Sequence, residues 1–277
     1  WKEKRIHTEH SHLSGRGGRH RALIFGMRRV ALIVGAGDAT GGALARRFAR
    51  EGMVVAIARR ARHADKLQKL AVSINASGGA AHAMPVDARV ESDVVDLVRR
   101  CEELGELELV VHNIGANVRF AAHETTERVF RKVWELACLS AFLVGREGSK
   151  PMAQRGRGTL IFTGATASVR GASHFSAFSA GMAGKRALSQ SLASELGPKG
   201  VHVAHVVVDG AIETPFVRGL MGDDAFAAAK AAGGLLAPEA IADTYLHLHQ
   251  QPRTAWSHEL DLRPASEAPW WSPRAKI

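Results

Sequence analysis

A glycine-rich stretch, GAGDATG at residues 35–41, directly follows the apolar run RVALIV. Gly35 permits a tight turn, while Gly37 and Gly41 let the backbone approach a bound group closely. If a helix begins here, its free N–H groups and its dipole favour an anion such as a pyrophosphate. A turn that only connects two elements is the alternative interpretation. The stretch therefore predicts an anion-binding loop, provided that a strand precedes it and a helix follows.

The elements that would position this loop alternate between short apolar runs and amphipathic segments. A short apolar run that ends in glycines predicts a buried strand of a parallel sheet. Apolar residues three and four apart predict a helix. The predicted strands are 28–37, 53–58, 80–87, 107–115, 158–165, 201–210 and 258–263, and the predicted helices are 41–52, 63–79, 91–105, about 124–152, 172–198 and 237–249. This alternation predicts an α/β fold with a doubly wound parallel sheet, the Rossmann fold.

The length and composition favour a single domain. The chain has 277 residues, 46% of them hydrophobic, which is enough for a sizeable core. We predict a disordered basic leader at 1–27, a Rossmann domain at 28–264 with a lid at about 214–237, and a C-terminal tail at 265–277. Trp270 and Trp271 in that tail could pack on a neighbour or fray in solvent, and the sequence leaves both open.

The net charge of +10 raises the question of nucleic acid. Residues 1–26 contribute +4 of this charge, and the other arginines are scattered, with no basic stripe that carries aromatic residues. No nucleic-acid partner is therefore predicted. No apolar run reaches about 18 residues, so we predict no membrane span and a cytoplasmic location. His7, His10 and His12 could hold a metal, but their spacing in a flexible leader is weak support, and no metal is predicted.

Several motifs together resemble those of the short-chain dehydrogenase/reductase family. GAGDATG resembles the family's TGxxxGxG loop, with Val34 in place of threonine and Ala39 in place of the middle glycine. HNIG at 112–115 resembles its NNAG, and DGAIETP at 209–215 resembles its PGxxxTP. The resemblance covers about residues 29–263. It implies a Rossmann fold, a nicotinamide dinucleotide as cofactor and a small-molecule substrate.

The resemblance also implies which residues contact the cofactor. Asp87 matches the aspartate that contacts adenine, and Thr214 matches the threonine that contacts the nicotinamide carboxamide. The implied cofactor-binding set is Gly35, Gly37, Asp38, Thr40, Gly41, Arg59, Asp87, Asn113, Gly115 and Thr214.

The choice between the two nicotinamide cofactors depends on the end of the second strand. NAD-type relatives carry an acidic residue there, whereas this chain has Ala58 followed by Arg59 and Arg60. A carboxylate would repel a 2′-phosphate and arginines would bind it, so NADP(H) is favoured over NAD(H). Asp38 argues the other way, since its charge could repel the same phosphate.

The catalytic positions of the family hold residues that cannot transfer a proton. In relatives, a tyrosine and a lysine four residues apart point from one helix toward the nicotinamide, a serine lies thirteen residues earlier, and an asparagine lies on the preceding helix. The block FSAGM places Phe178 and Met182 at the tyrosine and lysine positions. Counting back places Ala165 at the serine position and Ala137 at the asparagine position. The catalytic residues therefore stay unknown.

Two other residues near this block could take part. Thr166, together with Phe178 and Met182, is the predicted substrate pocket. Lys185 lies one turn beyond Met182 and could approach the same face. A solvent-facing or interface lysine is the favoured interpretation for Lys185.

Three functions stay open at this point. The first is an NADP(H)-dependent oxidoreductase with a non-standard catalytic site, which transfers hydride to a carbonyl or an activated double bond. The second is a catalytically inactive cofactor-binding protein that acts as a sensor or partner subunit. The third is a relative that binds nothing. We favour the first, because Thr214 would serve hydride chemistry. The small-residue face of helix 172–198 and the resemblance also imply a homodimer or homotetramer; that face comprises Ala180, Ala183, Gly184 and Ala187.

Overall fold

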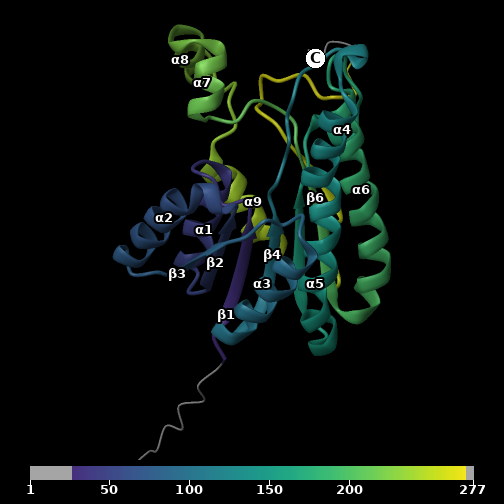
Figure 1. Cartoon of the computed structure of the whole chain (residues 1–277). Coiled ribbons are helices and arrows are strands. Elements are labelled where there is room, and N and C mark those ends of the chain that lie inside the picture. Colours follow the sequence, from purple (N-terminus) through teal and green to yellow (C-terminus); the bar gives the residue numbers. More distant parts are fainter. Residues whose placement is uncertain (1–26, 273–277) are drawn as a thin grey trace, which may run out of the picture.

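The computed structural model describes residues 27–272, and its centre is one sheet of seven parallel strands (Figure 1). The strands are β1 (Arg29–Val34), β2 (Val54–Arg59), β3 (Ala80–Pro85), β4 (Glu106–His112), β5 (Gly158–Thr163), β6 (Val201–Val208) and β7 (Glu259–Leu262). Their order across the sheet is β3-β2-β1-β4-β5-β6-β7. The winding reverses between β1 and β4, where sheets of this kind open a crevice at the carboxyl ends of the strands. The predicted fold class is confirmed.

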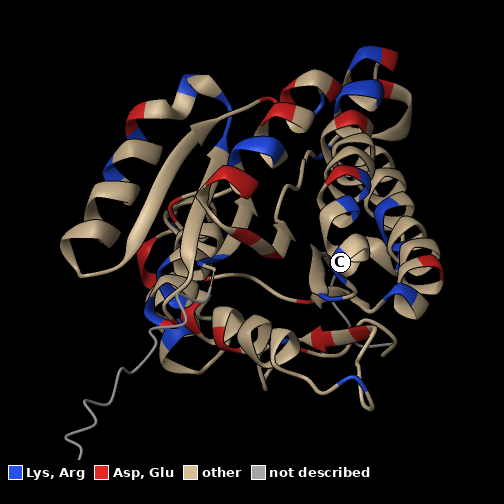
Figure 2. Cartoon of the chain, turned by 90° about the horizontal axis from the view of Figure 1, so that it is seen from below, with Lys and Arg blue, Asp and Glu red and all other residues tan. Residues whose placement is uncertain are grey.

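Helices cover both faces of this sheet. They are α1 (Thr40–Arg50), α2 (Ala64–Ala76), α3 (Glu91–Leu104), α4 (Glu127–Trp134), α5 (Ser140–Arg155), α6 (Ser176–Leu196), α7 (Pro215–Met221), α8 (Asp223–Ala231) and α9 (Pro238–His249), with short 3₁₀ turns at Ala61–His63, Ala122–Glu124, Thr166–Ser168 and Gly197–Lys199. One core holds side chains of α1, α2 and α9, and the other holds those of α3, α5 and α6. Ile33 enters the first core and its neighbour Leu32 enters the second, which explains why β1 is apolar throughout. Figure 2 shows the charged residues mostly on the outer helices.

The segment predicted as one helix at about 124–152 contains an irregular turn. A π-helical turn, η3 (Glu135–Leu139), joins α4 to α5. Thr126 sets the start of α4, because its hydroxyl accepts a hydrogen bond from the N–H of Val129 at 3.3 Å. Such turns add one residue and occur often at functional sites, and this one contains the buried Ala137.

The helix predicted from residue 172 begins at Ser176 instead. The loop before it includes His174, whose φ of 68° is incompatible with a right-handed helix. The small-residue face of α6 lies only partly at the surface: its alanines are exposed, whereas Gly184 packs against the same chain. Gly184 faces Cys138 of the same chain, since a Cβ there would lie 2.9 Å from its Sγ.

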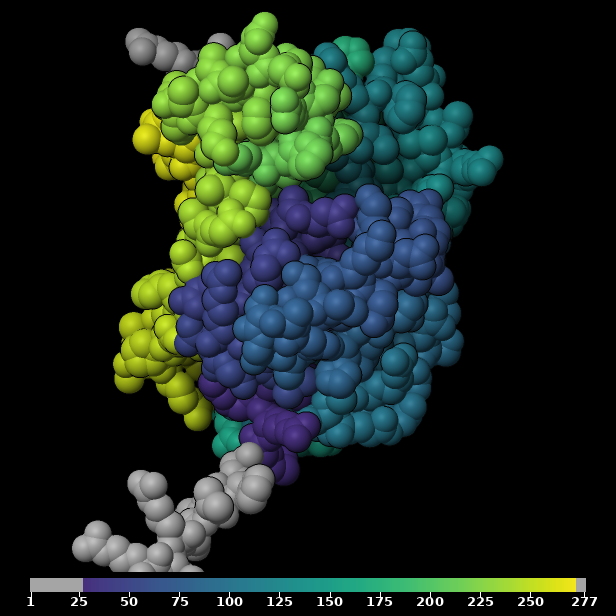
Figure 3. Space-filling view, turned by 90° about the vertical axis from the view of Figure 1, so that its left-hand side faces the viewer, coloured from purple at the N-terminus to yellow at the C-terminus, as the bar shows by residue number. Residues whose placement is uncertain are grey.

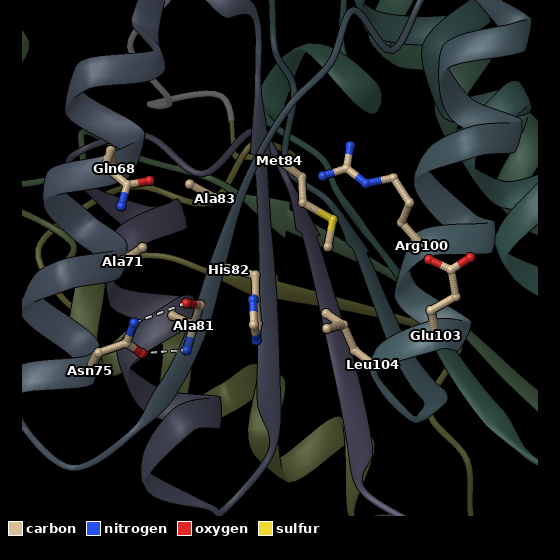
Figure 4. Close-up of a pocket in the computed structure, with 10 residues that line it drawn as sticks. All are labelled: Gln68, Ala71, Asn75, Ala81, His82, Ala83, Met84, Arg100, Glu103 and Leu104. Atoms are coloured by element: carbon tan, nitrogen blue, oxygen red, sulfur yellow. Dashed lines mark hydrogen bonds between the residues drawn. The ribbon is translucent and has the colours of Figure 1, made fainter.

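The outer edge of β3 is closed by a side chain. The Asn75 amide donates to the carbonyl oxygen of Ala81 at 3.1 Å and accepts from its N–H at 2.6 Å (Figure 4). The Asn75 amide thereby pairs with the backbone of Ala81 as a neighbouring strand would. Pro85, the last residue of β3, has no N–H with which another strand could pair. The groove beside this edge, of about 490 Å³, is lined partly by exposed polar side chains, His82 and Glu103 among them, and partly by apolar ones such as Met84 and Leu104. The edge is thus protected against the addition of another strand.

Two C-terminal features lie near the carboxyl ends of the strands. Helices α7 and α8 pack on each other above the first part of the chain, shown in purple and blue (Figure 3). Their exposed apolar side chains include Phe216 and Leu220. The described part of the tail docks on its own chain, because the N–H of Trp270 donates to Asp209 at 3.0 Å and the Arg263 guanidinium lies 4.4 Å from the centre of the Trp271 ring.

Within residues 27–272, no helix is both long enough and apolar enough to cross a membrane. The same residues contain no group of three or more His, Cys, Asp or Glu side chains that could hold a metal ion. His7, His10 and His12, like most of the predicted leader, lie outside the described residues.

Candidate functional site

A cavity of about 310 Å³ opens at the carboxyl ends of β1, β2 and β4, at the crossover point of the sheet. Six of the ten predicted cofactor-binding residues line it: Gly35, Gly37, Arg59, Asp87, Asn113 and Gly115. Asp38 lies at its edge, paired with Arg59. Thr40 and Gly41 are buried in the first turn of α1.

The glycines of this cavity fall into two kinds. A Cβ at Gly35 would lie 2.6 Å from the carbonyl oxygen of Asn113, and a Cβ at Gly41 would lie 2.5 Å from that of Gly35, so the fold itself excludes side chains there. Gly35 also has a φ of 94°. By contrast, a Cβ at Gly37 or Gly115 would meet nothing closer than 4.0 Å. These two glycines keep space free in the cavity, which is what the close approach of a ligand requires.

The start of α1 suits an anion. Ala39, at its N-cap, has no side-chain oxygen with which to cap the first turn. The first N–H groups of a helix have no partner within the helix. Together with the dipole, they favour a phosphate at this point.

Arg59 lies beside the glycine loop, since a Cβ at Gly37 would be 4.0 Å from its Cζ. Its Nη1 is buried and has no hydrogen-bond partner among residues 27–272. Asp38 lies 3.8 Å from that atom, and Lys66 also holds Asp38, at 3.3 Å. The acidic charge of Asp38 is therefore matched by two cations. If a bound anion took the place of Asp38 beside Nη1, Asp38 would still be paired with Lys66.

Four further basic residues line the cavity: Arg60, Arg62, His63 and Arg89. The sequence interpretation used Arg60 only in the argument for a 2′-phosphate and did not name the other three. Burial and the charge of Arg62 lower the pKa of Arg60. Burial and the charge of Arg59 lower the pKa of His63. Arg60, Arg62 and His63 follow the end of β2 directly, so the run ARRARH was the signal that could have identified them. The cavity is strongly basic on this side.

Asp87 has a partner that was also missed. Arg89 donates to its two carboxylate oxygens at 2.9 and 2.6 Å and thereby lowers its pKa. Arg89 lies 3.5 Å from Glu135 as well. Asp87 is thus held as a carboxylate at the edge of the cavity, opposite the arginines that follow β2.

The four residues that were predicted to occupy the catalytic positions of the family come together in space. Ala137, Phe178 and Met182 form one buried apolar cluster, and Ala165 packs against it. The helices meet closely, since a Cβ at Gly181 would lie 3.0 Å from the Cβ of Ala137. This cluster forms an apolar wall, and none of its side chains can donate or accept a proton.

Thr166 and Thr214 have other partners. The Thr166 hydroxyl donates to the buried Asp209 carboxylate at 2.7 Å, and Asp209 also accepts from Trp270. The Thr214 hydroxyl accepts from the N–H of Val217 at 3.0 Å and caps α7. Thr214 is not among the residues that line the cavity. Its predicted contact with a nicotinamide stays a prediction.

Lys185 differs from the favoured interpretation, which placed it in solvent or at an interface. It is fully buried, and its Nζ donates to the carbonyl oxygens of Ile114 at 2.6 Å and Thr163 at 3.0 Å. Burial lowers its pKa to about 7. A position on α6 that faces the sheet, one turn beyond Met182, explains the burial.

Comparison with known proteins gives consistent similarities. The family profile described as short chain dehydrogenase matches residues 29–225. The cis-4-hydroxycyclohexanecarboxylate dehydrogenase of Sinomonas cyclohexanicum is 30% identical over 224 residues, which are 79% of this chain and 88% of that protein. Among solved structures, a short-chain dehydrogenase from Rhodopseudomonas palustris is 41% identical with a TM-score of 0.73, over 85% of this chain and 98% of its own. An alcohol dehydrogenase from Thermococcus sibiricus, solved with 5-hydroxy-NADP, is 22% identical with a TM-score of 0.74, over 87% and 99%.

Proposed function

This chain belongs to the short-chain dehydrogenase/reductase family, and from that premise we propose that it is an NADP(H)-dependent oxidoreductase with a non-standard catalytic site. The observation that carries the proposal is the free space at Gly37 beside the buried Nη1 of Arg59, which makes an ion pair with Asp38 at 3.8 Å but no hydrogen bond among the described residues. A chain that bound nothing would have no physical need for a glycine there. The space at Gly37, the uncapped start of α1 and the basic lining fit a phosphate-bearing dinucleotide.

The preference for NADP(H) over NAD(H) rests on charge. Arg59 follows Ala58 at the end of β2, so the position that is acidic in NAD-type relatives carries no carboxylate. Asp38 does not cancel this effect, because Lys66 is close enough to hold it. The structural neighbour from Thermococcus sibiricus was solved with an NADP derivative, which agrees with this choice.

The substrate follows from the apolar wall. A bound nicotinamide cofactor supplies a hydride. Phe178 and Met182 would exclude water from the acceptor, and neither can give it a proton. A ketone would leave a localised alkoxide in an apolar site, which is unfavourable. An enone or a quinone gives a delocalised anion, so we propose activated double bonds as the preferred acceptors and simple ketones as poor ones.

A cofactor-binding protein without redox activity is the alternative. The observation that favours it is the apolar cluster of Ala137, Phe178 and Met182 with Ala165 against it, at the four positions that the sequence predicts to be catalytic in relatives. General acid–base groups contribute about 10²–10⁴ to the rate of such reactions. Without them the nucleotide could serve as a sensed ligand instead of a reactant.

Turnover separates the two functions. NADPH oxidation is followed with a set of quinones, enones and ketones, and a Gly37→Val variant serves as the control that cannot hold the nucleotide. Saturable turnover with a quinone or an enone, lost in the variant, supports the oxidoreductase. NADPH binding without turnover of any acceptor favours the alternative. A Phe178→Tyr/Met182→Lys double variant should reduce ketones at least about tenfold faster than the native protein, because it restores a proton donor.

We also propose a homodimer or homotetramer in the cytoplasm. Phe130, Trp134 and Phe142 on α4 and α5 are each about 40% exposed, beside exposed alanines of α6. Both cysteines, Cys101 and Cys138, are free thiols, which suits a reducing compartment. Light scattering of the purified protein would test the assembly, and a monomeric mass would contradict it.

A further inference from the structure

Lys185 is a buried amine that the proposed hydride transfer does not use. No part of its side chain reaches solvent, so it cannot contact a substrate or cofactor. Its two hydrogen bonds go to different strand ends. Ile114 follows β4 and lines the cavity, while Thr163 is the last residue of β5. One amine therefore joins α6 to two strand ends at the floor of the site.

The hydrogen bond to Ile114 continues to the glycine loop. The preceding residue, Asn113, donates from its backbone N–H to the carbonyl oxygen of Val34 at 2.8 Å and from its side-chain Nδ2 to that of Gly35 at 3.1 Å. Gly35 has the left-handed conformation that begins the phosphate loop. A short chain of contacts therefore runs from Lys185 through Ile114 and Asn113 to the loop that would hold the phosphates.

Among residues 27–272, the groups around the amine bring no compensating carboxylate. His112 on β4 is buried, with its Nε2 2.8 Å from the Ser140 hydroxyl, and its pKa lies well below the usual value because of burial and the charge of Lys185. Burial raises the pKa of Cys138 on η3. His205 on β6 has its Nδ1 2.9 Å from Glu259, and burial lowers its pKa to about 4. The carbonyl oxygens of Ile114 and Thr163 are thus the groups that hold Lys185 in place.

We infer that Lys185 is a positioning residue of the nucleotide site: its amine fixes the loop 113–115, and through it the glycine loop, in the conformation that binds the dinucleotide. This inference rests on the proposed nucleotide binding. It assigns to Lys185 a role in binding that requires no contact with the ligand. The negative charge of a bound nucleotide should favour the protonated form of the amine beneath the site, so nucleotide binding and protonation of Lys185 should be coupled.

The wild-type protein allows a direct test. With ¹³C,¹⁵N-labelled lysine, NMR follows the Lys185 resonance with pH; it is identified as the lysine that titrates near pH 7 instead of near 10.5. At saturation, NADPH places negative charge in the cavity above Lys185 and tightens the loop 113–115. Both effects should raise the pKa of Lys185 by at least about half a unit. An unchanged pKa at saturation, with NADPH binding shown by nicotinamide fluorescence, would overturn the inference and leave the proposed function intact. No NADPH binding at all would remove the proposed function instead.

Substitution provides a second test. Lys185→Met keeps the shape of the stem and removes the donors, while Lys199→Met, at an exposed lysine, is the matched control. The dissociation constant for NADPH should increase about tenfold or more in the Lys185 variant, corresponding to the loss of hydrogen bonds that hold the loop, and stay unchanged in the control. Equal affinity in a folded Lys185→Met protein would contradict the inference. If that variant does not fold, the NMR titration decides.

Discussion

Replacement of Lys185 by methionine should change how the stability of the protein depends on pH. The pKa of Lys185 falls from an ordinary value of 10.5 to about 7 on folding, because the amine is buried with no carboxylate beside it. Between these values the unfolded chain holds a proton that the folded protein releases. Stability therefore rises with pH in this window, and the penalty for burying the charge is fully present below pH 7.

The size of the effect follows from the shift. A full pH unit inside the window is worth about 1.4 kcal/mol, but the folded protein is already half-protonated at pH 7. The unfolding free energy contributed by Lys185 should therefore increase by about 2.3 kcal/mol between pH 7 and pH 9. His112 stays neutral in this window because its pKa lies well below the usual value, and groups that Lys185 does not affect contribute equally to both proteins. Between pH 7 and pH 9, the wild type should therefore gain this amount of unfolding free energy relative to Lys185→Met.

Urea unfolding at pH 6, 7, 8 and 9 measures that difference, because the unfolding free energy extrapolates linearly in denaturant. Lys199→Met provides the control with an exposed lysine, and its difference from wild type should be flat over the range. A flat difference for Lys185→Met as well would show that the amine stays charged in the folded protein. The reasoning from burial would then be refuted.

Two further predictions concern the glycine loop and the tail. Gly37→Ala should fold with an unchanged unfolding midpoint and lose at least about tenfold in NADPH affinity, since its Cβ would fill the cavity and meet no protein atom closer than the Arg59 Cζ at 4.0 Å. Gly41→Ala should be less stable, because its Cβ would lie 2.5 Å from the Gly35 carbonyl oxygen; equal melting temperatures for the two variants would contradict this. Asp209→Ala removes the acceptor of both Thr166 and the Trp270 N–H, so tryptophan fluorescence should shift to longer wavelength and the tail should become sensitive to protease; an unchanged spectrum would show that the tail is held by other contacts.

The order of elements could be predicted because its signals are local. Each strand is a short apolar run that parallel sheets bury on both faces, and glycines mark several of the ends. The glycine loop was predictable from the same kind of local signal. The family resemblance named Ala165, Phe178 and Met182 as catalytic positions, which stays a prediction, and the structure places Phe178 and Met182 in one apolar cluster with Ala165 against it.

The features that were missed depend on contacts between distant segments. Lys185 looks like a surface residue in a helix of mixed composition, and only the packing of α6 on β4 and β5 shows that it is buried. Arg89 was missed as the partner of Asp87, although it lies only two residues away, because the loop geometry decides where it points. The docking of Trp270 on Asp209 joins residues 61 apart in sequence. The π turn at η3 has no sequence signature that we can state.

The most direct test of the central claim is a titration of wild type and Arg59→Gln with NADPH and NADH, followed by nicotinamide fluorescence. Exposed Arg99, which pairs with Asp96 and Glu103 on its own helix α3, gives the matched control variant Arg99→Gln. We predict that the wild type binds NADPH at least about tenfold more tightly than NADH, and that Arg59→Gln removes this preference by weakening NADPH alone, because a hydrogen bond between charged groups contributes about 1.5–3 kcal/mol. Equal affinity for both nucleotides in the wild type would contradict the assignment of NADP(H), and no binding of either would contradict the nucleotide site itself.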